Sequence, residues 1–195
     1  MHVSKPLAEE ASVHYVIDAK GSRFIVQAFA TGLLASFGHS PRIAVGNFQG
    51  ELSFDRTGST IGAAQLKISI QSAGLEVVDN ISEKDRQEIH RKMCEEVLET
   101  DRFPEISYEC SKVSANGNGD RYWVALNGEL TLHGVTRPLP VSARAVIAGN
   151  SVRATGEFPV RQSEFGIAPV TAAAGAIKIQ DEVKCTFDIV AREPE

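Results

Sequence analysis

A regular alternation of apolar and polar residues runs through most of this sequence and constrains its fold more than any other feature. The clearest run is residues 183–192, where every odd position is apolar and most even positions are polar. Residues 141–147 and 152–160 repeat the pattern and are joined through Gly149 and Asn150, a pair suited to a tight hairpin turn. Because successive side chains of a strand point to opposite faces, each run predicts an antiparallel strand with one buried face.

The same alternation predicts strands over the rest of the chain. These strands lie at residues 13–18, 22–31, 43–54, 61–71, 106–110 and 122–132, with Asn116–Gly119 as the turn between the last two. The total is eight or nine strands separated by short turn signals. That number and spacing favour a barrel or a sandwich over alternating strands and helices.

One segment departs from the two-residue period. Apolar residues recur at helical spacing from Ile89 to Leu98. Ser82 resembles an N-terminal helix cap, and Pro104 lies where a helix would have to stop. The pattern predicts one amphipathic helix at about residues 82–99.

The composition is that of an ordinary globular chain, with 43% hydrophobic and 23% charged residues among 195. No polar linker divides it, so we expect a single domain over residues 13–192, preceded by a flexible tail at residues 1–12. Acidic and basic residues are interspersed and the net charge is only -5. Neither nucleic acid nor an anionic membrane surface is therefore an expected partner. No stretch is long and apolar enough for stable membrane insertion.

The cysteines and the N-terminus give further expectations. Cys94, Cys110 and Cys185 are far apart and form no C-x-x-C pair, which argues against a disulfide framework or a cysteine metal site. No apolar stretch of the signal-peptide type is visible near Met1. We expect a cytoplasmic location, or a periplasmic one if the native start is missing.

The sizes of the inward-facing residues decide whether a barrel built from these strands is hollow or filled. Large residues such as Phe48 and Phe187 share the apolar face with small ones such as Ala145, Ala154 and Gly156. Small neighbours favour an apolar cavity, whereas large residues opposite the alanines would give a packed core. Alternation alone leaves both interpretations open.

Five blocks carry a family resemblance in their order along the chain: residues 15–24, 46–55, 101–108, 128–138 and 161–167. The most specific is Leu-Thr-Leu-His-Gly-Val-Thr-Arg-Pro at residues 130–138. Together the blocks resemble the YceI family of polyisoprenoid-binding, lipocalin-like barrels. Many relatives have a histidine in the second strand, where this chain has Ile25–Ala28, and its residues 32–41 resemble a branch with a Gly-His pair.

The resemblance implies an all-β fold, an extended eight-stranded antiparallel lipocalin-like β-barrel closed at one end by a helix and loops. It also implies that a polyisoprenoid or isoprenoid quinone lies along the interior. Inward alternation and the family blocks together make the following residues candidates for ligand binding: Phe29, Phe37, His39, Phe48, Leu52, Ile68, Ile70, Phe103, Tyr108, Leu130, His133, Ala145, Ala154, Phe165 and Phe187.

Two histidines could support metal or proton-transfer chemistry, since His39 and His133 both lie in family-like blocks. No further ligands stand at a set spacing beside them, so we favour a structural or headgroup role and expect no metal and no catalytic residue. Ser40 beside His39 is a poor nucleophile and base pair, because neighbouring residues of a strand face opposite ways.

Two surface features have alternative interpretations. The polar stretch Arg161–Glu164 is either a surface ion pair at the barrel rim or a headgroup clamp. Trp123 alternates with inward residues and is expected to face outward, where it could contact a second copy in a homodimer.

The sequence therefore predicts a carrier of a long apolar lipid, with no cofactor and no enzymatic activity. Two alternatives remain open. One is an enzyme that acts on a small amphiphile through His39 or His133, and the other is a stress-related scaffold whose barrel is filled.

Overall fold

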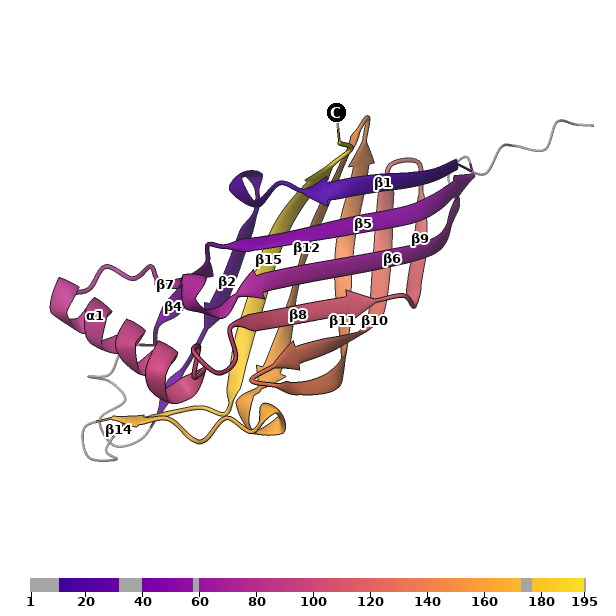
Figure 1. Ribbon diagram of the computed structural model, residues 1–195. Helices are drawn as coiled ribbons and strands as arrows, with labels where there is room; N and C mark the ends of the chain where they lie inside the picture. Colours follow the sequence, from indigo (N-terminus) through magenta and orange to yellow (C-terminus); the bar gives the residue numbers. More distant parts are fainter. Residues whose placement is uncertain (1–10, 32–39, 58–59, 173–176, 195) are drawn as a thin grey trace, which may run out of the picture.

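Eight antiparallel strands close into a barrel in the computed structural model, which describes residues 11–31, 40–57, 60–172 and 177–194 (Figure 1). The ring closes where β1 pairs with β15, with Val16 opposite Arg192. This closure confirms the predicted barrel. In their order around the ring the strands are β1 (Ala11–Ile17), β5 (Phe48–Thr57), β6 (Thr60–Gln71), β8 (Glu105–Cys110), β10 (Arg121–Leu132), β11 (Val135–Ala148), β12 (Ser151–Arg161) and β15 (Glu182–Arg192).

Shorter strands extend the barrel at both ends. At one end β2 pairs with β15, β4 with β2, and β7 with β4, while at the other β9 pairs with β10. A separate small sheet joins β3, β14 and β13. The bounds are β2 (Arg23–Gln27), β3 (Ala30–Thr31), β4 (Arg42–Val45), β7 (Leu75–Val77), β9 (Val113–Asn118), β13 (Thr171–Ala172) and β14 (Ile177–Ile179).

Two of the predicted strands are interrupted. Residues 43–54 are divided between β4 and β5 at a corner where the Gly46 amide donates to the Gly74 carbonyl. Residues 22–31 are divided between β2 and β3. At the N-terminal end, residues 11 and 12 belong to β1 and not to a tail.

Tight turns connect the long strands. Gly149 takes a positive φ of 58° in the turn between β11 and β12, as predicted. The turn before β10 lies at Gly119 and Asp120, whereas Asn116–Gly119 was expected, because β9 continues to Asn118. His133 and Gly134, with φ of 51° and 72°, form the two-residue turn between β10 and β11.

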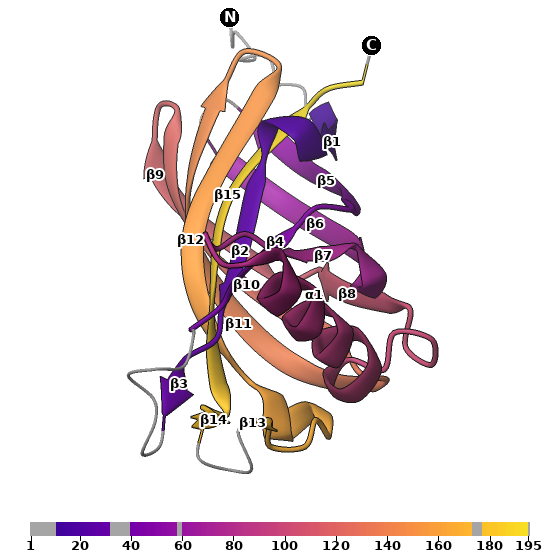
Figure 2. The ribbon, with the colours of Figure 1, turned by 90° about the vertical axis from the view of Figure 1, so that its left-hand side faces the viewer.

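The predicted helix is present as α1 (Glu83–Lys92), continued by a π-helical turn, η4 (Met93–Val97). The Ser82 hydroxyl accepts a hydrogen bond from the Asp85 amide, which confirms the expected cap. The α1 helix lies across the β4 and β7 end of the barrel (Figures 1 and 2). Short 3-10 turns complete the chain at η1 (Ala19–Gly21), η3 (Ser72–Gly74) and η5 (Gln162–Phe165).

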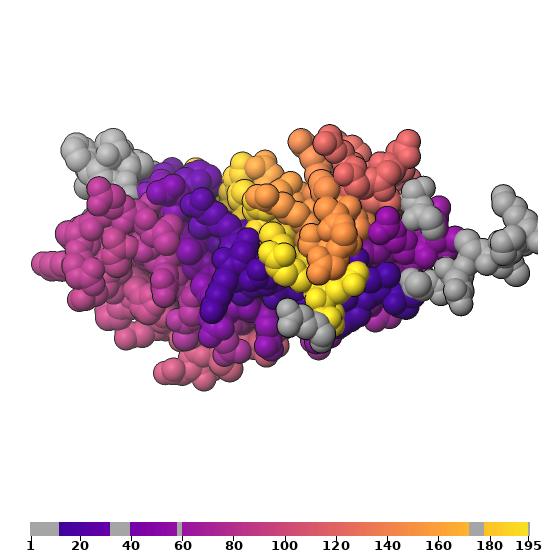
Figure 3. All heavy atoms as spheres, turned by 90° about the horizontal axis from the view of Figure 1, so that it is seen from above, coloured from indigo at the N-terminus to yellow at the C-terminus, as the bar shows by residue number. Residues whose placement is uncertain are grey.

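The molecule is elongated along the barrel, and its N-terminal and C-terminal strands lie side by side on the surface (Figure 3). The inward faces of the strands supply the core, whose two clusters follow one another along the barrel axis and share Phe24, Val26, Ile106 and Leu132 at their boundary. No helix within the described ranges is long and apolar enough to cross a bilayer.

Candidate functional site

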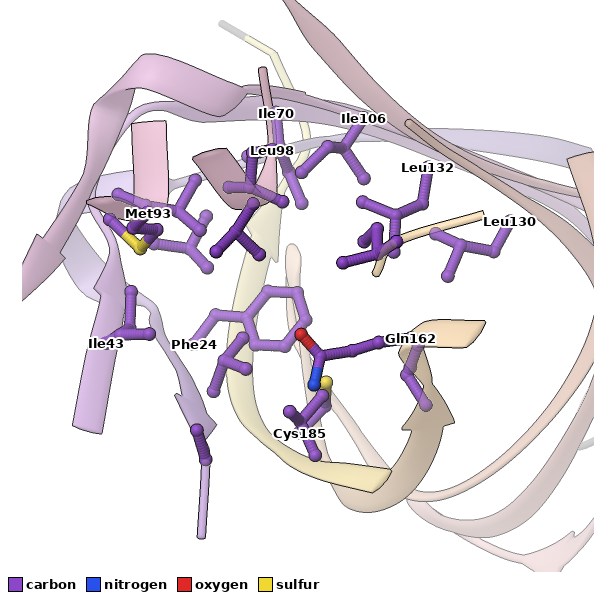
Figure 4. A pocket seen from close by; sticks show the side chains of 18 of the residues that line it. Phe24, Ile43, Ile70, Met93, Leu98, Ile106, Leu130, Leu132, Gln162 and Cys185 are labelled. Carbon is purple, nitrogen blue, oxygen red and sulfur yellow. The ribbon is translucent and has the colours of Figure 1, made fainter. Parts of the chain in front are cut away.

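A cavity of about 560 Å³ occupies the half of the barrel nearest α1 (Figure 4). We call it the main cavity. Its wall is built from inward-facing side chains of the long strands, and its α1 end is covered by Ile89 and Met93. Apolar residues make up most of the lining, including Phe24, Ile43, Ile70, Leu98, Ile106, Leu130, Leu132, Phe158 and Val183.

A second, smaller cavity of about 130 Å³ lies farther along the same interior, and we call it the far cavity. Ile68 of β6 and Ile189 of β15 line both cavities, so the two adjoin. The long strands pass from one to the other: β10 supplies Leu130 and Leu132 to the main cavity and Val124 to the far one. The interior is therefore a tube in two compartments.

Small side chains distinguish the far cavity from the main one. Tyr122 and Phe54, each 4% exposed, line it at the barrel end away from α1, and Tyr15 stacks on Phe54 with ring centroids 5.4 Å apart. These bulky aromatic rings occupy that end of the interior. Six alanines line the space between them and the main cavity: Ala64, Ala115, Ala143, Ala145, Ala154 and Ala191.

Two glycines in the wall make room for aromatic side chains of the main cavity. A Cβ atom at Gly156 would lie 2.6 Å from the Phe187 ring, and one at Gly128 would lie 2.6 Å from the Tyr108 hydroxyl. A Cβ would also lie 2.5 Å from the Ser142 carbonyl oxygen at Gly156 and 2.6 Å from the Glu109 carbonyl oxygen at Gly128, so neither position accepts a larger residue without a backbone shift. The positions of Phe187 and Tyr108 therefore depend on these glycines.

Two titratable groups of the main cavity, Tyr108 and Cys185, are held in their neutral forms. The Tyr108 hydroxyl donates to the Leu139 carbonyl at 3.1 Å, and burial raises the pKa of this phenol to about 12. Burial likewise raises the pKa of the Cys185 thiol to about 12. Neither group ionises near neutral pH, so the interior favours an uncharged, apolar occupant.

The structure distributes the candidate ligand-binding residues between both cavities and the surrounding wall. The main cavity is lined by Phe48, Ile68, Ile70, Tyr108, Leu130 and Phe187. The far cavity is lined by Leu52, Ile68, Ala145 and Ala154. Neither lining includes Phe29, Phe103, His133 or Phe165, and Phe37 and His39 lie outside the described residues. Their roles in ligand binding remain predictions.

His133 joins three separate segments. Its Nε2 lies 3.0 Å from the Glu99 carboxylate and its Nδ1 lies 3.3 Å from the Phe165 carbonyl. The ring also packs against Phe103, with centroids 4.3 Å apart. Among the described residues, no group of three or more His, Cys, Asp or Glu is placed to hold a metal ion. His133 therefore connects the β10–β11 turn, the end of the helix and η5.

Gln162 reaches into the main cavity from η5 (Figure 4), although the sequence did not single it out. The sequence left two interpretations of the stretch Arg161–Glu164, a surface ion pair at the barrel rim or a headgroup clamp, and Arg161 pairs with Glu182 at 3.5 Å. The available signal was the period of β12. Gln162 follows Phe158 and Val160 at intervals of two and therefore continues their inward face.

Trp123 faces outward, as predicted, and is 63% exposed. The guanidinium carbon of Arg144, on the neighbouring strand β11, lies 4.9 Å from its ring centroid. A homodimer through this surface remains a prediction.

A closed antiparallel barrel around an elongated apolar cavity defines a class of lipocalin-like binding barrels. The model of the YceI-like domain matches residues 15–191, so this chain belongs to the YceI-like family. A UPF0312 protein from Shewanella baltica is 32% identical over 169 residues, which cover 83% of this chain and 80% of that protein.

Solved structures show the same fold at low sequence identity. BcnA from Burkholderia cenocepacia superposes with a TM-score of 0.66 at 18% identity, covering 89% of this chain and 98% of that one. A polyisoprenoid binding domain from Saccharophagus degradans, implicated in plant cell wall breakdown, gives a TM-score of 0.65 at 12% identity. That match covers 93% of this chain and 99% of the other.

Proposed function

We propose that this protein binds and carries a long apolar lipid of the polyisoprenoid type inside its barrel. The observation that carries the proposal is the apolar lining of a cavity of about 560 Å³. Ligand cavities in proteins commonly measure roughly 300–1,000 Å³. The far cavity extends the space along the barrel axis, which suits an elongated chain better than a compact molecule. The YceI-like family and the polyisoprenoid binding domain with the same fold support the same class of ligand.

Burial of apolar surface supplies the affinity. At about 25 cal/mol per Å², a chain that buries on the order of 400 Å² gains roughly 10 kcal/mol before ordering costs are subtracted. This driving force is non-directional, so binding does not depend on many specific polar contacts.

The cavity favours a carrier over an enzyme. Tyr108 and Cys185 line the cavity and are kept protonated near neutral pH by burial, while the other titratable lining groups, Asp85 and Lys92, are engaged by Ser82 and Glu88. His133 is engaged by Glu99 and Phe165 outside both linings. The open volume also argues against a filled scaffold.

The test is to identify what the purified protein retains. We expect organic extraction followed by mass spectrometry to yield an isoprenoid lipid, and lipid-free protein to bind added polyprenyl compounds. Repeated extraction without lipid, together with no binding of added compounds, would show that the carrier proposal is wrong.

Two substitutions in β11 provide a matched comparison. Leu139→Glu puts a carboxylate on the wall of the main cavity, whereas Val146→Glu puts one on the outer face, where Val146 is 37% exposed. We expect only Leu139→Glu to lose lipid, because an apolar cavity does not solvate the charge. Thermal melts of both variants establish that they remain folded.

A further inference from the structure

Gln162 extends its side-chain amide into the main cavity, whose lining is mostly apolar. It lies at the start of η5 and lines the main cavity, as do Phe24 and Cys185 (Figure 4). The other polar side chains of this lining belong to Asp85, Lys92, Ser107, Tyr108 and Thr171. A polar group in such a position needs a hydrogen-bonding partner.

The amide of Gln162 is held in one orientation by its nitrogen. Nε2 donates to the Gln180 carbonyl at 3.1 Å and to the Asp181 carbonyl at 3.3 Å. Both partners accept only, so the nitrogen and not the oxygen must face them. The backbone amide of Gln162 also donates to the Asp181 carbonyl, at 2.9 Å, which fixes the base of the side chain.

The amide oxygen is therefore left pointing into the cavity (Figure 4). An amide oxygen accepts hydrogen bonds and cannot donate one. Among the polar lining groups, the Tyr108 hydroxyl donates instead to the Leu139 carbonyl, and the Asp85 carboxylate accepts from the Ser82 hydroxyl. A ligand that brings a donor would complete the arrangement.

The charges around this position disfavour an anionic headgroup. The Asp181 carboxylate accepts from the hydroxyl and the amide of Ser163 at 2.6 and 2.7 Å, and these bonds lower its pKa. The cation in the lining, Lys92, lies on α1 and is 3.7 Å from the Glu88 carboxylate. The adjacent cation, Arg161, is paired with the Glu182 carboxylate at 3.5 Å and also interacts with Asp181, so the acceptor oxygens around Gln162 favour an uncharged donor over a phosphate or a carboxylate.

We propose that Gln162 is the headgroup site and that the lipid carried by this barrel is uncharged and has a hydrogen-bond donor, such as a polyprenyl alcohol. The inference rests on the proposed function and narrows its ligand class. An isoprenoid quinone has carbonyl acceptors in its ring and offers no donor to the Gln162 oxygen, so it is not the preferred occupant.

The sharpest test compares geranylgeraniol with its methyl ether, which keeps the chain and loses the donor. We expect lipid-free protein to bind the alcohol about threefold to tenfold more tightly, the range of one net hydrogen bond. Equal affinity for the two compounds would overturn this inference and leave the carrier proposal standing. If the protein bound neither compound, the carrier proposal would fail and this inference with it.

Two variants assign the preference to the residue. Gln162→Met keeps an unbranched side chain in the cavity and removes the acceptor, and we expect it to bind the alcohol and the ether equally. Gln49→Met is the matched control, because Gln49 is exposed on β5 and its side chain does not line the main cavity. It should retain the preference of the wild type. A preference that survives in Gln162→Met would contradict the assignment, whatever the melting temperature of that variant.

Discussion

His133 shows how much one turn residue can connect. It occupies a left-handed conformation, with φ of 51°, between β10 and β11, and its ring nitrogens reach Glu99 and Phe165. Only 12% of its side chain is exposed. The residue therefore links the turn, the end of the helix and η5.

We predict that His133→Ala lowers the free energy of unfolding by about 1–3 kcal/mol, because it removes two hydrogen bonds and puts alanine in a left-handed conformation. Metal content should stay at background and lipid retention should change little. Denaturant unfolding measures the stability, and elemental analysis measures the metal content. His133→Asn is the control for the backbone, since asparagine tolerates this conformation. Stoichiometric zinc, copper or iron that is present in the wild type and lost in the variant would contradict the prediction.

At His39 the sequence-based prediction is the same, although that residue lies outside the described part of the chain. His39→Ala should leave metal content at background. The two histidines differ in what sequence alone could say of them. Spacing excluded a metal cluster around either, but only the folded geometry brings His133 to Glu99, 34 positions away in the chain.

Gln162 marks the limit of residue-scale prediction. Its place in the inward period of β12 could have been inferred from the alternation that identified that strand. Its acceptor role could not, because the Gln180 and Asp181 carbonyls that orient it belong to the segment leading into β15. Pairing between distant segments sets the direction of the amide.

At the scale of elements, the strands that build the far cavity have unusually small inward residues. Ala145 of β11 lies directly opposite Ala154 of β12, and both line the far cavity. The hairpin turn at Gly149 that pairs these strands was predicted from the sequence. Two opposed alanines leave space that larger side chains could fill.

We predict that Ala145→Leu and Ala154→Leu reduce the retention of long polyprenyl chains, because leucine occupies space that the end of the chain would enter. Stability should change by less than the roughly 1–3 kcal/mol that overpacking of a dense core costs. Lipid retention and thermal melts of lipid-free protein provide the two readouts. Ala125→Leu is the matched control, since Ala125 is exposed on the outer face of β10. A marked loss of stability with unchanged lipid content would place the ligand elsewhere.

Alternation predicted which residues of these strands point inward, but not how far along the barrel axis each of them lies. Leu130 and Tyr122 share the inward face of β10, yet they line different cavities. Pairing register decides such levels, and a period of two carries no information about register. The corner at Gly46 was missed although the inward positions change there from odd (Ile43, Val45) to even (Phe48, Gly50), a shift of phase that is visible in the sequence.

At the scale of the whole molecule, ionised carboxylates connect segments that are distant in sequence. Glu88, which pairs with Arg91 on α1, has a lowered pKa, as do four carboxyl groups that interact with distant segments. The causes are the Gly21 amide and Arg192 at Asp18, Arg102 and His133 at Glu99, Ser163 at Asp181, and Arg153 at Asp188. In the unfolded chain these groups regain their ordinary pKa values of about 4.

We predict that the protein is less stable at about pH 3 than at about pH 7, because the lowered pKa values contribute stability above the unfolded values that is lost as pH falls through the folded ones. Urea midpoints measured across this range test the effect. Asp188→Asn, which removes the partner of Arg153, should show a smaller decrease. An unchanged midpoint across the range in the wild type would refute the prediction.

The sequence predicted the class of the whole molecule only partly from local pattern. Eight or nine short strands were compatible with a barrel or a sandwich, and the family blocks were needed to favour the barrel. Closure depends on the pairing of β1 with β15, in which Val16 lies opposite Arg192 and Ile17 lies opposite Ala191. No local period can reveal a contact between residues so far apart.

That closing pair sets the order of events during synthesis of the protein. The strand that completes the ring is the last one translated, so the wall of the cavity is incomplete until about residue 192 has left the ribosome. Until then the inward apolar faces of the earlier strands have no partner on one side. Such nascent intermediates are prone to aggregate, and contacts of high sequence separation form slowly. Under the proposed function, a lipid can therefore enter only after β15 has been synthesised, since the cavity that would receive it does not exist earlier.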